Sequence, residues 1–162
     1  NRYHIFSFRK FTIWIIVILT LQLIYGAFMA GLHAALAAPT WPDINGKIIP
    51  GVLFNQHPFI KNFIDNLITV QFIHRLLAYT LTILIIIWCW RSWKINNILL
   101  QKTRWLPLII ILIQVTLGVL TVINSAIHIP ITLAVLHQFT AMLFLLVMMW
   151  MLYINKKEMV AG

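Results

Sequence analysis

The chain has 162 residues, of which 62% are hydrophobic and only 9% are charged, and its mean hydropathy is +0.93. This composition excludes an ordinary soluble domain. The formal net charge of +9 would suit a nucleic-acid-binding protein, but the cations are grouped at the ends of apolar stretches, so nucleic acid is not expected as a partner. The single cysteine, Cys89, excludes an internal disulfide and a zinc cluster of thiolates.

Four apolar stretches are long enough to cross a bilayer, whose hydrocarbon core takes about 20 helical residues. They cover residues 11–32, 67–93, 105–127 and 131–153. Each is expected to be a helix, because hydrocarbon offers the backbone of an isolated segment no other hydrogen-bond partner. The sequence therefore predicts an all-α integral membrane protein in which residues 1–162 form one four-helix domain. Since the chain begins at Asn1, without Met and without a signal-peptide pattern, we expect it to be a piece of a longer protein.

Positive charges gather at one end of the predicted spans. They precede the first span, lie between the second and third, and follow the fourth: Arg2, Arg9, Lys10, Arg91, Lys94, Lys102, Arg104, Lys156 and Lys157. The long first loop, residues 33–66, has only Lys47 and Lys61, offset by two aspartates. The positive-inside rule therefore predicts that both termini lie on the cytoplasmic or matrix side. Six tryptophans are expected to form an interfacial belt at that face: Trp14, Trp88, Trp90, Trp93, Trp105 and Trp150.

The first loop lies on the outer side in this topology. Its Asn45-Gly46 pair predicts a tight turn. The spacing of Phe59-Ile60 and Phe63-Ile64 indicates a short amphipathic helix on the outer surface. A solvated linker is the alternative, but we expect a packed cap, because so apolar a loop would otherwise expose much hydrophobic surface to water.

A weak internal repeat runs through the spans. The spacing Gln-x-x-x-Gly occurs in the first span at Gln22–Gly26 and in the third at Gln114–Gly118. Each is followed by a span with a histidine near its outer end, His74 in the second and His137 in the fourth. Two copies of one helical hairpin, related by an axis along the membrane normal, would place these histidines face to face.

Depth along the helices also brings the two histidines together. If the spans begin at Leu67 and Ile131, His74 lies about 10 Å and His137 about 9 Å down its helix. Two imidazoles at one depth can hold one metal, and the simplest such group is an Fe-porphyrin with one histidine from each of two helices. No Cys-x-x-Cys-His motif occurs, so the haem would be a non-covalent haem b. The alternative for each histidine is an interhelical hydrogen bond.

Arg75 is a costly residue within a membrane, and no Asp or Glu lies in any span to pair with it. A haem propionate would serve, because arginine binds carboxylates through two parallel hydrogen bonds; snorkelling to the outer interface is the alternative. Glycines that would make room for a flat macrocycle, or allow ordinary close helix packing, are Gly26, Gly31 and Gly118. Polar residues expected to line the pocket or to link helices are Gln22, Gln114, Asn124 and Gln138. Histidines expected at interfaces or in the loop rather than as ligands are His4, His33, His57 and His128.

Taken together, these residues resemble the haem A synthase family, membrane enzymes that oxidise a methyl group of haem O to the formyl group of haem A. The similarity is greatest to the second, C-terminal half of that family and covers most of residues 20–140. The motifs that carry it are Gly26-Ala-Phe-Met-Ala-Gly31-Leu, Thr40-Trp-Pro-Asp-Ile-Asn-Gly46, Ile49-Pro50, Thr69-Val-Gln-Phe-Ile-His-Arg75, Gln114-Val-Thr-Leu-Gly118 and Leu133-Ala-Val-Leu-His-Gln138.

The resemblance implies a complete enzyme of two similar four-helix bundles. The second bundle holds haem b through two histidines, which map onto His74 and His137. The family's first half has a glutamate, implicated in the hydroxylation, three residues before its first helix histidine, and the equivalent position here is Gln71. A neutral amide cannot act as a base. We therefore expect this chain to be the cofactor half of an eight-span protein, without catalytic competence of its own.

The resemblance also implies haem O as the substrate of the missing half, a ferredoxin or quinol as electron donor, and association with haem O synthase. The bacterial inner membrane is the expected location, with the mitochondrial inner membrane as the alternative. Two other classes stay open. An electron-transfer cytochrome would need a second histidine pair near the inner face, where the spans contain no histidine. A structural or transport bundle without a cofactor would leave Arg75 and the level histidines unexplained.

Overall fold

The computed structural model describes the backbone of residues 2–160 and the side chains of residues 6–155, so the side chains of Arg2, His4, Lys156 and Lys157 lie outside the described residues. Its elements, in chain order, are α1 (Arg2–Gly31), η1 (Ala34–Ala37), η2 (Phe59–Phe63), α2 (Leu67–Ser92), α3 (Ile98–Thr103), α4 (Leu106–Ile123) and α5 (Ile131–Val160). Four segments are long and apolar enough to cross a membrane: Phe6–Gly31, Leu67–Ser92, Ile98–Ile123 and Ile131–Asn155. The predicted all-α membrane fold with four spans is therefore confirmed, and the chain is an integral membrane protein.

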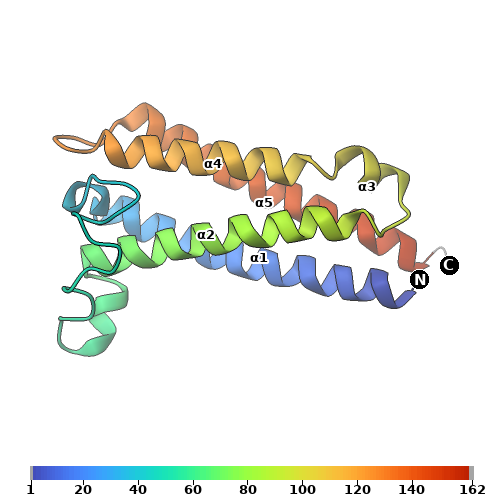
Figure 1. The fold of residues 1–162 in the computed structure, drawn as a ribbon, viewed down its shortest axis with the longest axis horizontal. Coiled ribbons are helices and arrows are strands. Elements are labelled where there is room, and N and C mark those ends of the chain that lie inside the picture. Colours follow the sequence, from blue (N-terminus) through green and yellow to red (C-terminus); the bar gives the residue numbers. More distant parts are fainter. Residues whose placement is uncertain (1, 161–162) are drawn as a thin grey trace.

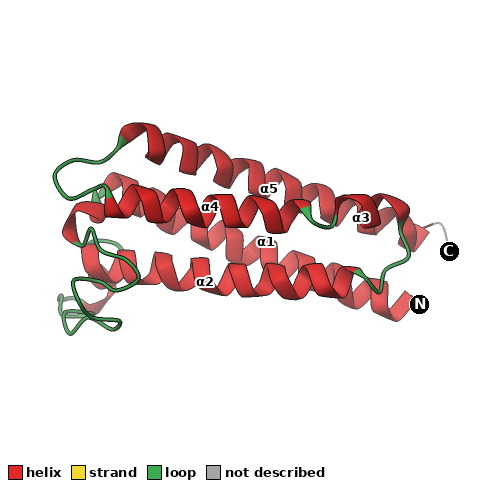
Figure 2. Ribbon diagram, turned by 45° about the horizontal axis from the view of Figure 1, so that its top comes forward, coloured by secondary structure: helices red, strands yellow, loops and turns green. Residues whose placement is uncertain are grey.

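The four long helices form one bundle (Figure 1). Helix α1 packs along α2 and α4 packs along α5, while contacts of α1 with α5 and of α2 with α4 close the bundle. The start of α1, the end of α5 and the short α3 lie together at one end, here named the terminal end. The connection between α1 and α2 lies at the opposite end, here named the loop end (Figure 2). The predicted grouping of the basic segments therefore corresponds to one end of the bundle.

The third span differs in detail from its predicted range of 105–127. Helix α4 ends at Ile123, and the backbone N–H of its cap residue Asn124 bonds the Leu120 carbonyl at 3.2 Å. A separate helix, α3, precedes α4, and its N-terminus is capped by the Asn97 side chain, which accepts a bond of 2.9 Å from the Leu100 N–H. Helix α3 was not predicted, because it lies within the charged turn between two apolar stretches.

The buried apolar core occupies the terminal half of the bundle. Its members are Phe8, Ile15 and Leu19 of α1, Leu81, Ile85, Trp88 and Cys89 of α2, Ile95, Leu100, Ile110 and Ile111 further along the chain, and Phe144, Val147, Met148, Met151 and Ile154 of α5. Trp88 is fully buried, and its indole N–H donates to the Thr12 hydroxyl at 2.9 Å. The assignment of Trp88 to an interfacial belt was therefore wrong, because the rotation of α2 turns this side chain toward α1. The other five predicted belt tryptophans are all more than a third exposed.

The loop between α1 and α2 is partly folded onto the bundle. Its predicted tight turn is present, because Ile44 and Lys47 exchange backbone bonds of 2.8 and 3.2 Å around Asn45 and Gly46, whose φ angles are 52° and 81°. The predicted amphipathic helix is a single 3-10 segment, η2, in the expected place. Ala34 and Ala38 are fully buried, whereas Ile48 is 84% exposed. The loop is thus a cap with an apolar outer surface.

Candidate functional site: two histidines between the hairpins

Helices α2 and α5 each carry one histidine a short distance from the loop end. Helix α2 begins at Leu67, since the Asn66 side chain accepts bonds of 3.1 Å from the N–H groups of Ile68 and Thr69. This cap sets the depth of His74. The imidazoles of His74 and His137 meet across the bundle, with ring centres 6.4 Å apart and planes inclined at 72°. The structure therefore places His74 and His137 next to each other, and these are the two histidines that were predicted to lie at the same depth in the membrane.

The side chain of His74 contacts Gln22 of α1. The Gln22 amide nitrogen lies 3.4 Å from His74 Nε2, and because an amide NH₂ group only donates, the imidazole nitrogen accepts. The other ring nitrogen, Nδ1, is buried and has no partner in the structure. The Gln22 amide oxygen is likewise buried and unpartnered. Polar atoms buried in this way are uncommon, and each one marks a place where a further group could bind.

The side chain of His137 makes two contacts with Gln114 of α4. The Gln114 amide nitrogen lies 3.3 Å from His137 Nε2, and the Gln114 main-chain oxygen lies 3.0 Å from His137 Nδ1. The Gln114 amide oxygen is buried without a partner, as in Gln22. The two glutamines of the sequence repeat therefore each bond the histidine of the following long helix. These are the interhelical bonds that were the alternative interpretation of the histidines, and a metal bound at Nε2 would have to replace them.

The glycines of the repeat lie directly against the imidazoles. A Cβ atom at Gly118 would lie 2.8 Å from His137 Cε1, a distance that real Cβ atoms essentially never show. A Cβ atom at Gly26 would lie 3.5 Å from His74 Cε1, an ordinary contact. Gly31 has no neighbour within 4 Å of such an atom, so it lies against neither imidazole. Gly118 thus allows the His137 ring to approach α4 closely, a role different from the two that the sequence predicted for the glycines.

Arg75, the residue directly after His74 on α2, points into the loop. Its guanidinium donates to the main-chain oxygens of Asp43 at 2.6 Å, Thr40 at 2.7 Å and Ala38 at 3.4 Å. Gln71 also donates to Ala38, at 2.9 Å, and its own amide oxygen is buried without a partner. Sequence reasoning did not foresee this use of Arg75, because no local pattern shows that the loop returns to α2. A carboxylate ligand of Arg75 would share the guanidinium with these carbonyls.

The turn that Arg75 contacts also carries an acidic side chain, that of Asp43. The pKa of Asp43 lies below its usual range, chiefly because the Gly46 N–H donates to its carboxylate at 2.8 Å and also because of a hydrogen bond with the Thr40 hydroxyl. Asp43 is half-buried, and the positive charge of Arg75 is the smallest of the contributions that lower its pKa. Asp43 therefore stabilises the turn in its ionised form.

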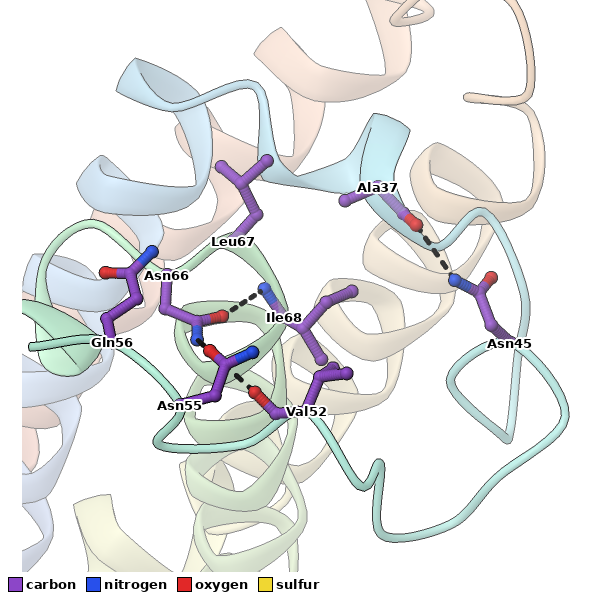
Figure 3. Close-up of a pocket in the computed structure, with 8 residues that line it drawn as sticks. All are labelled: Ala37, Asn45, Val52, Asn55, Gln56, Asn66, Leu67 and Ile68. Carbon is purple, nitrogen blue, oxygen red and sulfur yellow. Dashed lines mark hydrogen bonds between the residues drawn. The ribbon is translucent and has the colours of Figure 1, made fainter.

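An open cavity of about 400 Å³ lies at the loop end, between the loop and the start of α2 (Figure 3). Its lining includes Asn45, Asn55, Gln56 and Asn66, and it contains neither histidine. Asn66 donates to Asn55 at 3.0 Å there. Among the side chains that the structure describes, no group of three or more His, Cys, Asp or Glu is placed to hold a metal ion. The pair of His74 and His137 offers two nitrogen atoms, which is fewer ligands than such a group needs.

Comparison with known proteins shows the family of the chain. The profile of a family described as "Cytochrome oxidase assembly protein" matches residues 4–149, which include both histidines and all four spans up to the last part of α5. The chain belongs to this family. No solved structure matches it at a significant level.

Several relatives of this family member are haem A synthases from Brucella. The protein of Brucella suis is 39% identical over 140 residues, which are 86% of this chain and 38% of the relative. The proteins of Brucella ovis and Brucella anthropi are 38% and 36% identical over the same shares. The chain therefore spans well under half the length of the relatives it matches.

Proposed function

We propose that this chain is the haem b-binding bundle of a haem A synthase, with His74 and His137 as the two axial ligands of the iron. The complete enzyme is an oxidoreductase that converts the methyl group of haem O to the formyl group of haem A for cytochrome oxidase. The observation that carries the proposal is the pair of imidazoles that α2 and α5 place 6.4 Å apart in a membrane bundle.

The residues of the site fit such a group. The Nε2 atoms of both imidazoles accept from a glutamine amide, so each carries the lone pair with which a histidine would bind a metal. The buried apolar cluster of the terminal half reaches only to Leu19 on α1 and to Ile111 on α4, so it ends before the level of Gln22 and Gln114. The unpartnered amide oxygens of these two glutamines lie beyond its end, beside the histidines.

The chain's own residues would bind and orient the group. His74 and His137 would supply the two nitrogen ligands. Gly26 on α1 and Gly118 on α4 would leave space for the imidazole beside each of them. Gln22 and Gln114 would turn away from the Nε2 atoms that they now bond, because a nitrogen cannot both accept that bond and bind iron. A haem b bound in this way supplies one-electron transfer at the outer side of the membrane. Arg75 would bind a propionate only while sharing its guanidinium with the loop.

The oxidation itself is assigned to a second bundle. Gln71 stands where the family's first half has a glutamate, and an amide cannot take up a proton as a general base. More than half of each matched relative lies outside the matched region, which leaves room for that bundle. We therefore propose that this chain corresponds to the second half of an eight-span protein and that haem O binds to the first half. This bundle alone would then not convert haem O to haem A.

The charge distribution and the relatives of the chain indicate the orientation and the membrane of the proposed enzyme. Three described cations lie where α2 ends and α3 follows, at the terminal end: Arg91 in the last turn of α2, Lys94 just after α2, and Arg104 at the end of α3. They favour a cytoplasmic location for that end. The Brucella relatives favour a bacterial inner membrane. A ferredoxin or a quinol is proposed as the electron donor, and haem O synthase as a partner that delivers the substrate.

The proposal is tested by the haem content and spectrum of the chain purified in detergent. A reduced-minus-oxidised spectrum and a pyridine haemochrome assay should show one low-spin haem b per chain. The haem should be lost or become high-spin in His74→Ala and in His137→Ala, and should be unchanged in His128→Ala, whose exposed histidine lies in the last loop. A monodisperse, helical protein without haem, or an unchanged low-spin spectrum in either ligand variant, would overturn the assignment.

A further inference from the structure

The two imidazoles differ in how their second nitrogen is held. His137 Nδ1 lies 3.0 Å from the Gln114 main-chain oxygen, whereas His74 Nδ1 is buried and has no partner. A carbonyl oxygen only accepts, so the proton of His137 is on Nδ1 and the lone pair is on Nε2. The tautomer and the ring orientation of His137 are therefore set by the fold, and those of His74 are set only by its one bond to Gln22.

Gly118 is the reason for this difference. A helical carbonyl bonds the N–H four residues further on and keeps a second lone pair, so the Gln114 oxygen can accept from a side chain that comes close enough to α4. The His137 ring comes so close that a Cβ atom at Gly118 would lie 2.8 Å from its Cε1. At Gly26, the matching position beside His74, a Cβ atom would lie 3.5 Å from His74 Cε1. The His74 ring thus stands further from α1, and no bond between its Nδ1 and a carbonyl forms.

We propose that Gly118 and the Gln114 carbonyl position His137 as the fixed axial ligand and leave His74 as the exchangeable one; this rests on the proposed function. An imidazole that donates its Nδ1 proton to a carbonyl is a more basic ligand and loses less orientational freedom when it binds a metal. His74 has neither advantage. An added small ligand should therefore replace His74 and not His137. Gly118 is a positioning residue in this scheme, since it acts through His137.

The first test compares Gly118→Ala with its repeat counterpart Gly26→Ala, by titrating the haem-free chain in detergent with hemin. The methyl group at residue 118 would push the ring off the carbonyl. Loss of a bond that orients a metal ligand weakens metal binding by about 10- to 100-fold. Gly118→Ala should show that loss together with a high-spin fraction, and Gly26→Ala should stay within about threefold of the unchanged chain. Equal losses in the two variants would overturn the proposal.

The second test does not depend on the folding of a Gly118 variant. His74→Ala should keep its haem as a five-coordinate high-spin species, bind CO when reduced, and return to low spin on addition of imidazole. His137→Ala should retain at least tenfold less haem under the same conditions, since its remaining ligand is the less constrained one. The reverse order, or equal retention, would overturn the inference. If the unchanged chain binds no haem, the proposed function fails instead; if it binds haem through both histidines without this asymmetry, only the present inference fails.

Discussion

Replacing Arg75 with methionine should release the loop from the bundle without unfolding the helices. Methionine keeps much of the apolar stem of arginine but cannot donate to the carbonyls of Asp43, Thr40 and Ala38, which the guanidinium reaches at 2.6, 2.7 and 3.4 Å. Arg75 is only 9% exposed, so water cannot easily replace it at all three carbonyls. The loop should therefore open far more often in the variant than in the unchanged chain.

The size of the effect follows from the two short bonds. A hydrogen bond that involves a charged group contributes about 1.5–3 kcal/mol, so the two together stabilise the closed loop by about 3 kcal/mol at the lower bound. A free-energy change of about 3 kcal/mol alters an equilibrium by roughly 100-fold. Amide hydrogen exchange of the turn around Asn45, where Ile44 and Lys47 exchange backbone bonds, should accelerate by about that factor.

The measurement is hydrogen exchange followed by mass spectrometry, on the chain in detergent. The matched control is Arg91→Met, which removes a bond of 3.0 Å to the Ser7 hydroxyl at the other end of the bundle and should leave exchange in the loop unchanged. Unchanged protection of residues 38–47 in the Arg75 variant would refute the role of Arg75 as the anchor of the loop. Faster exchange throughout α2 would show instead that Arg75 holds the helix itself.

Two further predictions concern other parts of the chain. Trp88→Phe removes the buried bond to Thr12 and part of a fully buried ring, so it should destabilise the bundle by about 1–3 kcal/mol; a melting temperature equal to that of the exposed-site variant Trp90→Phe would contradict this. Asp43 has a lowered pKa, so its stabilisation of the turn is present above the usual aspartate pKa of about 4 and is lost as the pH falls through the folded-state value. Exchange in the turn should accelerate in that range, and Asp43→Asn should abolish this pH dependence.

The spans could be predicted from sequence because the length of an apolar run and the bilayer thickness suffice to define them. The equal depth of His74 and His137 could also be predicted, because it depends only on helical rise, and the internal repeat predicted that they face each other. The contacts of Arg75 could not, since they depend on how a loop of irregular structure returns to α2. The burial of Trp88 likewise depends on the rotation of a helix that is apolar on every side, and such a helix gives no amphipathic signal.

The position of the main buried apolar cluster in the terminal half has a consequence for how such a protein can diverge. Because this cluster lies away from the histidines, substitutions near them can change ligand chemistry while this part of the scaffold is retained. A duplicated bundle could in this way keep one architecture and acquire a different reactivity in each copy. The amide of Gln71, buried at the loop end beside a main-chain carbonyl, shows how small such a change can be.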